Sequence, residues 1–127
     1  MSAANAVATT GIAAIVVAYD SEETLDDCLS RLRAAQGVGE IRVVDNQSTD
    51  ATMDLVQRQS VADPRIRFIA NPDNPGFAVA CNQGAHVSAA PWLAFVNPDC
   101  FVETDTLVRL RAAALQLEGG LVGAELC

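Results

Sequence analysis

Short apolar runs alternate with amphipathic helical patterns along this chain, and that alternation limits the available folds more than any other feature. The run at 12–18 is wholly apolar and rich in β-branched residues, which is typical of a strand covered on both faces. Further strands are predicted at 41–44, 66–70, 92–96 and 121–126. Because helical patterns separate these runs, the order predicts an α/β, Rossmann-like fold with a mainly parallel sheet and helices on both faces.

The helical segments have recognisable starts. Ser21 is predicted to cap the first helix, and Glu22 and Glu23 stand where the positive end of a helix dipole favours acidic side chains. Thr49 or Asp50 is predicted to cap the second helix, which runs to about residue 59. A third is predicted over about 77–89, and a fourth from residue 104 or 106.

Polar side chains follow the carboxyl ends of the predicted strands. They are Tyr19, Asp20, Asp45, Asn46, Asn71, Asn97 and Asp99. Right-handed crossovers bring the carboxyl ends of parallel strands to one edge of the sheet, where open α/β sheets bind their ligands. A carboxylate at that edge suits a hard divalent cation, which would in turn bind a phosphate group. The sequence therefore predicts a binding site for a phosphate-bearing ligand at this edge.

The charge balance excludes several other classes of function. Sixteen acidic residues face eight basic ones, for a net charge of −8, and a nucleic-acid partner would need a basic face. No Gly-x-Gly-x-x-Gly follows the first predicted strand and no Gly-x-x-x-x-Gly-Lys-Ser/Thr occurs, so neither dinucleotide-binding fingerprint nor P-loop is present. A phosphate ligand would therefore depend on a metal ion or on backbone N–H groups.

The length of 127 residues predicts one domain, preceded by a flexible N-terminus over 1–11. No apolar run approaches the roughly 20 residues that a membrane-spanning helix needs. Residues 1–10 contain no Lys or Arg, which argues against a secretory signal, and the cysteines form no Cys-x-x-Cys pair. We expect the protein to be cytoplasmic or, alternatively, to act at the inner face of the membrane.

Four segments, in this order, resemble the motifs of family 2 glycosyltransferases of the GT-A fold. They are IVVAYD at 15–20, IRVVDNQSTD at 41–50, NPGFAVACNQG at 74–84 and FVNPD at 95–99. The resemblance extends over about 12–102, and its Asn-Pro-Asp and Gly-Phe-Ala forms are similar to the rhamnosyltransferase-like branch. It implies that 12–127 is the nucleotide-sugar-binding part of an inverting transferase. Such an enzyme moves a sugar from a UDP- or dTDP-linked donor to a hydroxyl of a glycan or lipid-linked acceptor in polysaccharide or glycan synthesis.

The resemblance also implies roles for individual residues. The nucleotide-binding candidates are Ala18, Tyr19, Asp20, Asp45, Asn46, Ser48, Asn74, Gly76, Asn82 and Asn97. Asp99 matches the last carboxylate of the family's Asp-x-Asp motif, which implies a bound Mg²⁺ or Mn²⁺. Asn97 replaces the first carboxylate of that motif, so the ion would be held mainly by Asp99, water and phosphate. Asp45 is expected to face a ligand and to contribute little to stability.

The resemblance leaves the catalytic base unassigned. In this family the base comes later in the sequence, so we expect it beyond Cys127, expect the fold to be truncated at its C-terminus, and expect this chain alone to be inactive. The alternative is a non-catalytic α/β module that binds nucleotides or forms a homodimer through an exposed sheet edge. Structural interpretations also stay open. Asp45 and Asp99 are alternatively caps, Asn82 alternatively satisfies a buried backbone group, and Tyr19 alternatively packs against the fold.

Overall fold

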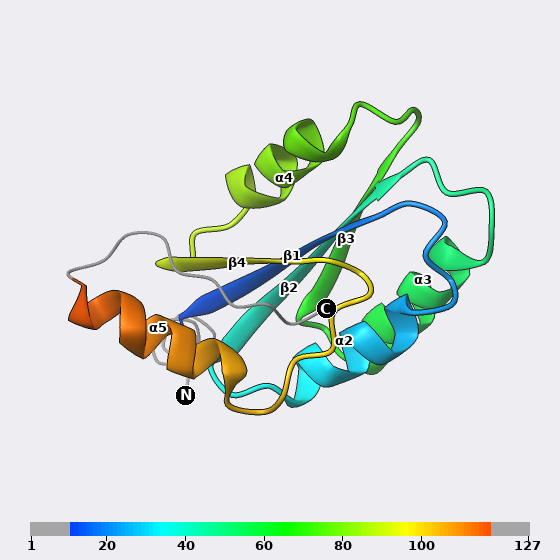
Figure 1. Cartoon of the computed structure of the whole chain (residues 1–127). Helices are drawn as coiled ribbons and strands as arrows, with labels where there is room; N and C mark the ends of the chain where they lie inside the picture. Colours follow the sequence, from blue (N-terminus) through cyan, green and yellow to red (C-terminus); the bar gives the residue numbers. More distant parts are fainter. Residues whose placement is uncertain (1–10, 118–127) are drawn as a thin grey trace.

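Strands and helices alternate without interruption in this protein, for which the computed structural model describes residues 11–117 (Figure 1). The elements are β1 (Ile12–Ala18), α2 (Leu25–Ala34), β2 (Val38–Asn46), α3 (Thr52–Ala62), β3 (Ile66–Asn71), α4 (Phe77–His86), β4 (Trp92–Val96) and α5 (Thr106–Gln116). The predicted strand at 121–126, and residues 1–10 of the predicted N-terminal segment, lie outside the described residues. No helix within 11–117 is long and apolar enough to cross a membrane.

The four described strands form one parallel sheet in the order β3-β2-β1-β4. The chain moves outward from β1 through β2 to β3 and then returns to the other side of β1 to form β4. The strand order therefore reverses between β1 and β4. In open α/β sheets a crevice forms outside the carboxyl ends of the strands at such a reversal, and ligands bind there. The predicted parallel α/β architecture is confirmed.

Helices cover both faces of the sheet, as predicted. Helices α2, α3 and α5 lie on one face, and α4 lies on the other (Figure 1). All seven residues of β1 are buried, which explains why this central strand is apolar throughout. The larger core lies on the α2 side and includes Leu29, Leu32 and Val43, whereas a smaller cluster of Val17, Val44 and Ala80 packs under α4.

Helix boundaries differ from the predicted ones at several points. The predicted Ser21 cap is wrong, because α2 begins only at Leu25, with Thr24 at the N-cap position. Ser21 belongs to a preceding turn, in which its carbonyl accepts hydrogen bonds from the amides of Thr24 (3.2 Å) and Leu25 (3.0 Å). The N-cap position of α3 is Ala51, one or two residues later than the predicted cap, and α4 ends three residues earlier than predicted, at His86. The start of α5 matches one of the two predicted positions.

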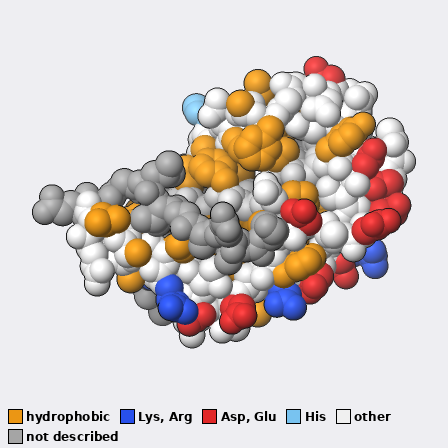
Figure 2. Space-filling model, in the orientation of Figure 1, with side chains coloured by type: hydrophobic (Ala, Val, Ile, Leu, Met, Phe, Trp, Pro, Cys, Tyr) orange, Lys and Arg blue, Asp and Glu red, His pale blue; other side chains and the backbone are white. Residues whose placement is uncertain are grey.

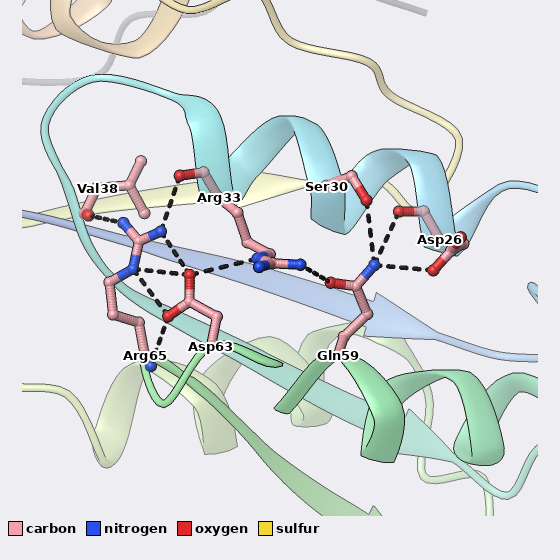
Figure 3. A network of polar contacts seen from close by, with 7 residues as sticks. All are labelled: Asp26, Ser30, Arg33, Val38, Gln59, Asp63 and Arg65. Atoms are coloured by element: carbon pink, nitrogen blue, oxygen red, sulfur yellow. Dashed lines mark hydrogen bonds and ion pairs between the residues drawn. The ribbon is translucent and has the colours of Figure 1, made fainter. Parts of the chain in front are cut away.

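A set of polar side chains, here called the α2–α3 network, joins α2 to α3 and to the start of β2 (Figure 3). Gln59 is buried; its Nε2 donates to Asp26 Oδ1 (2.8 Å) and Ser30 Oγ (3.1 Å), and its Oε1 accepts from Arg33 (3.0 Å). The Arg65 guanidinium donates to the backbone carbonyls of Val38 and Arg33, at 2.8 Å each.

Asp63 completes the α2–α3 network. Its carboxylate pairs with Arg65 (2.6 Å) and with Arg33 (3.4 Å). The hydrogen bonds from the Arg65 side chain are the main reason that the pKa of Asp63 falls to about 2, against the opposing effect of burial. Each charged group of this network therefore has an oppositely charged or hydrogen-bonding partner.

Candidate nucleotide site

The polar residues that follow the strands meet at one edge of the sheet. Ala18 of β1 lies level with Asp45 of β2, and Val16 of β1 lies level with Val96, the last residue of β4. Because all four strands are parallel, Asp45, the penultimate residue of β2, and Asp99, just after β4, lie at the same edge of the sheet. The expectation that strand-end residues gather at one edge is confirmed.

A pocket of about 450 Å³ opens where β1 and β4 end, at the reversal of the strand order. It is lined by Asp20, Ser21, Glu22, Glu23, Thr24, Asp50, Asn97, Pro98 and Asp99. Three of the predicted site residues, Asp20, Asn97 and Asp99, line this pocket together. Five of the lining residues are acidic and none is basic. Figure 2 shows acidic side chains gathered over the loops that follow β1 and β2, on the right of the view. We call this pocket the acidic pocket.

Asp99 is an exposed carboxylate of the acidic pocket. Within residues 11–117, no hydrogen bond or ion pair engages its oxygens. The loop that carries it is nevertheless held in place, because the carbonyl of Asn97 accepts hydrogen bonds from the Cys100 amide (3.0 Å) and the Cys28 thiol (3.6 Å). Burial, assisted by the negative charges of Asp27 and Asp99, raises the pKa of Cys28 to about 12, so the thiol keeps the proton that it donates.

The loops after β1 and β2 hold each other through reciprocal hydrogen bonds. The Asp20 amide donates to Ser48 Oγ (2.9 Å), and the Thr49 amide donates to Asp20 Oδ1 (2.7 Å). The amide of the next residue, Ser21, donates to Thr52 Oγ1 (2.8 Å). Asp20 adopts a φ of 45°, a left-handed conformation that these contacts maintain. The β1 side of the acidic pocket is therefore preformed.

Asp50 links the same two loops from the β2 side. Its carboxylate accepts hydrogen bonds from the Thr52 amide (2.9 Å), the Thr52 hydroxyl and the Glu22 amide (3.3 Å). Although burial acts to raise the pKa of Asp50, these hydrogen bonds outweigh it, and the pKa lies below its ordinary value. Asp50 thus adds a stable negative charge to the acidic pocket.

Asp45 is more buried than expected. It is only 3% exposed, and its carboxylate accepts hydrogen bonds from both the amide (3.1 Å) and the hydroxyl of Ser48. The expectation that Asp45 faces a ligand rather than the interior is wrong in this respect, because a serine three residues later lets the carboxylate close its own turn. Since Ser48 also accepts the Asp20 amide, Asp45 supports the β1 loop through Ser48.

Asn46 belongs to a cluster of side-chain amides on the β2–β3 side of the edge. Its Oδ1 accepts from Asn71 Nδ2 (2.9 Å), and its own Nδ2 donates to the carbonyl of Gly76 (3.2 Å). Asn71 and Gln83 exchange two further hydrogen bonds, of 2.8 and 3.0 Å. We call Asn46, Asn71, Gln83 and the Gly76 carbonyl the amide cluster.

Other predicted residues lie along the same edge but outside the lining of the acidic pocket. Asn74 accepts the Gly76 amide (3.1 Å), and Gly76 has a φ of 96°, which favours glycine. Tyr19 is 55% exposed, so the interpretation that it packs against the fold is wrong. Asn82 is exposed on α4, and no hydrogen bond of its side chain occurs within the described residues. Ala18 is fully buried, which leaves only its backbone near the edge.

Several residues of this edge were missed by sequence reasoning. Glu22 and Glu23 were interpreted only through the helix dipole, although the late start of α2 places them on the lining of the acidic pocket. Asp50 was considered only as a helix cap. Gln83 was not singled out, because its partners lie 12 positions and more away in the sequence.

The acidic pocket has oxygen donors suited to a hard cation, which prefers carboxylate, amide and water oxygens. Within the described part of the chain, however, no three acidic, histidine or cysteine side chains are grouped as ligands for a metal ion. Carboxylate oxygens of Asp20, Glu22 and Asp50 already accept hydrogen bonds from backbone amides. Among the lining carboxylates, Glu23 and Asp99 have no hydrogen bond or ion pair within residues 11–117, and both are therefore able to act as ligands.

Comparison with known proteins identifies relatives of this chain. The family described as glycosyl transferase family 2 matches residues 13–125. The succinoglycan biosynthesis protein ExoO of Rhizobium meliloti (strain 1021) is 37% identical over 97 residues, which make up 76% of this chain and 27% of that protein. Glycosyltransferase AglE of Haloferax volcanii is 26% identical over 118 residues, or 87% of this chain and 39% of the relative. The chain thus spans well under half the length of these two relatives.

Solved structures of glycosyltransferases share the fold. S. aureus TarS 1-349 in complex with UDP-GlcNAc has a TM-score of 0.72 at 23% identity, over 84% of this chain and 31% of that chain. The mannosyltransferase PcManGT from Pyrobaculum calidifontis, in complex with GDP-Man and Mn²⁺, also has a TM-score of 0.72, at 22% identity and with the same coverage. The expected GT-A, Rossmann-like fold is confirmed. On the family match over residues 13–125, this chain belongs to glycosyl transferase family 2.

Proposed function

We propose that this chain binds the nucleoside-diphosphate part of a sugar donor at the carboxyl edge of its sheet, as the donor-binding part of an inverting glycosyltransferase. The acidic pocket is the observation that carries the proposal, because it lies at the reversal of strand order and presents the free carboxylate of Asp99. The complexes of TarS with UDP-GlcNAc and of PcManGT with GDP-Man support a nucleotide-sugar ligand.

A divalent cation, Mg²⁺ or Mn²⁺, is part of this proposal. Mg²⁺ in proteins typically takes one or two carboxylates and completes its coordination with water and substrate phosphates, so one free carboxylate on an acidic edge is a sufficient protein contribution. Asp99 would bind the ion, and the neutral amide of Asn97 would stand beside it. When bound, the ion supplies positive charge that offsets the charge on the leaving nucleoside diphosphate. The Mn²⁺ in the PcManGT complex supports this assignment.

The remaining candidate residues fall into two groups, those whose side chains are available to contact a ligand and those that shape the surrounding loops. The exposed ring of Tyr19 is available to stack on a base. Asn82 keeps its full hydrogen-bonding capacity, and Asn46 keeps one N–H that its contacts within the described residues leave unused. Asp20, Asp45 and Ser48 shape the loops around the ligand, as do Asn74, Gly76 and the buried Ala18. We assign no residue of this chain as the catalytic base, so the chain alone should bind a donor without transferring its sugar.

The finer identity of the reaction is also a proposal. The resemblance of the 74–84 and 95–99 motifs favours a UDP- or dTDP-linked hexose, with rhamnose as one such sugar. The acceptor would be a hydroxyl of a glycan or lipid-linked intermediate in polysaccharide synthesis, and the name of the relative ExoO supports this pathway class. Such synthesis would take place in the cytoplasm or at the inner face of the membrane.

A second candidate function is a non-catalytic module that forms homodimers through β4. Strand β4 pairs with β1 alone within the described sheet, and its Leu93 and Phe95 side chains are 42% and 53% exposed. Figure 2 shows an apolar patch between α4 and β4. Exposed apolar strands at a sheet edge favour pairing with another chain. A monomeric chain by sedimentation at about 100 μM would remove this candidate.

Calorimetry distinguishes the two functions. UDP, dTDP and GDP are titrated into the chain with and without Mn²⁺, and we expect binding only when the metal is present. Asp99→Asn should weaken this binding about 100-fold, because it removes the charged ligand of the ion and keeps the side chain's size. Asp105→Asn is the matched control, since Asp105 is exposed and pairs only loosely with Arg109, at 3.9 Å. Folded protein that binds none of the three nucleotides would contradict the proposal.

A further inference from the structure

Gln83 stands at the far end of a chain of hydrogen bonds that leads to the proposed nucleotide site. It projects from α4 toward Asn71, the last residue of β3. Asn71 Nδ2 donates to Gln83 Oε1 (2.8 Å) and to Asn46 Oδ1 (2.9 Å), while Asn71 Oδ1 accepts from Gln83 Nε2 (3.0 Å). Both N–H groups of Asn71 are thus in use, and its amide can take one orientation only.

The side chain of Asn46 is held between Asn71 and the Gly76 carbonyl. Asn46 is 3% exposed, and its Oδ1 faces an N–H of Asn71 while its Nδ2 donates to the Gly76 carbonyl at 3.2 Å. Rotating the Asn46 amide by half a turn would place two N–H groups against each other and two oxygens against each other. That arrangement would lose both hydrogen bonds in a buried place, where an unpaired polar group is costly. The Gly76 carbonyl, which can only accept, thus sets the orientation of Asn46, and Gln83 supports this arrangement from the far side by two hydrogen bonds to Asn71.

The same contacts hold the loop between β3 and α4. The Gly76 carbonyl, which accepts from Asn46, also accepts the Ala80 amide in the first turn of α4 (3.2 Å). At the other end of the loop, Gln47 Nε2 donates to the carbonyl of Pro72 (2.9 Å). Two side chains from the end of β2 thus attach both ends of the 72–76 loop to the carboxyl edge of the sheet.

The amide cluster is separate from what holds α4 on the sheet. Helix α4 packs through apolar contacts of Ala80 and Cys81 with Val17 and Val44, and through the close approach of Gly84 to Ile15. A Cβ at Gly84 would lie 2.6 Å from Ile15 Cγ2, which shows how near the helix sits to β1. Removing the amide of Gln83 leaves these contacts intact. Its effect should therefore concentrate on the loop and on Asn46.

We propose that Gln83 is a positioning residue for nucleotide binding, which acts through Asn71 to hold the Asn46 amide and the 72–76 loop in place. This inference rests on the proposed function, since it takes the carboxyl edge as the nucleotide site. Without Gln83, the Asn71 side chain keeps, among the described residues, only its hydrogen bond to Asn46, so both side chains and the loop that Asn46 holds become more mobile, and the bound state must order these groups again. We expect UDP to bind about tenfold more weakly, in the range of one or two lost hydrogen bonds.

A double-mutant cycle tests whether Gln83 acts through Asn46. UDP is titrated with Mn²⁺ into the unmodified chain, Gln83→Met, Asn46→Ala and the double variant. Methionine keeps the unbranched shape and helix propensity of glutamine without its amide. We expect Gln83→Met to weaken binding about tenfold alone and to add almost nothing when Asn46 is already alanine. Additive losses, or a Gln83→Met affinity equal to that of the unmodified chain, would overturn the proposal. Gln57→Met, an exposed glutamine on α3, is the control and should bind UDP normally.

Hydrogen exchange without nucleotide supplies a second readout that needs only folded Gln83→Met protein. We expect the amides of 74–80 to exchange at least about fivefold faster than in the unmodified chain, with those of β1 unchanged. Unchanged exchange at 74–80 would overturn the positioning role even if Asn46→Ala does not fold. If the unmodified chain binds no nucleotide, the proposed function itself fails, and that result is recognised before any variant is measured.

Discussion

Two polar regions at opposite edges of the same sheet use charge in opposite ways. At the amino edge, the α2–α3 network joins Asp63 to Arg33 and Arg65 and gives Gln59 a full set of partners (Figure 3). At the carboxyl edge, the acidic pocket gathers five acidic residues and no basic one, and Asp99 has no partner among residues 11–117. Charges that are paired inside a protein can support the fold, whereas a one-sided cluster costs repulsion unless a cation binds. We therefore expect the amino edge to contribute to stability, and this contrast is consistent with the ligand-binding role proposed for the acidic pocket.

The largest effect on stability is expected at Arg65. Arg65→Met removes the donors to Asp63 and to the carbonyls of Val38 and Arg33, and it leaves Asp63 with a single, longer ion pair. Because the Arg65 side chain is 32% exposed, we expect a loss of about 2 kcal/mol in the free energy of unfolding, below the cost of breaking a fully buried pair. Urea unfolding measures it. Arg67→Met, an exposed arginine two residues on, should change stability by less than about 0.5 kcal/mol.

The pH dependence of stability sharpens the same contrast. The pKa of Asp63 is lowered from 3.8 to about 2, chiefly by hydrogen bonds from Arg65, so its stabilising contribution is complete above about pH 4. As the pH falls from about 4 toward 2, this contribution is lost. Urea unfolding between pH 6 and pH 2.5 should show a steeper loss in the unmodified chain than in Arg65→Met. Parallel curves for the two proteins would show that Arg65 does not lower the pKa of Asp63.

Asp45 lies at the carboxyl edge, but we expect it to contribute to stability, as Asp63 does at the amino edge. It is buried and hydrogen-bonded to Ser48, so Asp45→Ala should lower the free energy of unfolding by about 1 to 2 kcal/mol. Ser48→Ala should reproduce part of that loss, since it removes the hydroxyl that joins Asp45 to the Asp20 amide. Thermal unfolding of both variants measures the effect. An Asp45→Ala protein as stable as the unmodified chain would break the distinction between buried and exposed acids at this edge.

The smallest effect on stability is expected at Asp99, despite its proposed role in binding. Asp99→Asn breaks no recorded contact of the described residues and removes one charge from a repulsive cluster. The free energy of unfolding should therefore stay within about 0.5 kcal/mol of that of the unmodified chain. Urea unfolding without metal measures this value. A loss as large as that of Arg65→Met would mean that Asp99 serves the fold, as a cap does.

The sheet and the gathering of polar residues at its carboxyl edge were predictable because they follow from local patterns. An apolar, β-branched run such as 12–18 is readable as a buried strand, and parallel strands place Asp45 and Asp99 on one edge. The Asp45–Ser48 turn is also local, and the three-residue spacing could have revealed it. The amide cluster was not readable, because Asn46, Asn71 and Gln83 meet only after β3 and α4 have packed. The late start of α2 depends likewise on contacts between two loops, such as Ser21 with Thr52.

Paramagnetic broadening by Mn²⁺ tests most directly which edge binds the ligand. Backbone amide signals of the chain are recorded by NMR with UDP and a small amount of Mn²⁺, and again with UDP and Mg²⁺ as the diamagnetic reference. The account predicts selective broadening of the amides of 20–24, 97 and 99, which line the acidic pocket, and sharp signals at 63, 65 and 66, beside or in the α2–α3 network. Asp99→Asn should remove most of that broadening. Equal broadening at both edges, or broadening that survives Asp99→Asn unchanged, would contradict the assignment of the acidic pocket to a metal-bound nucleotide.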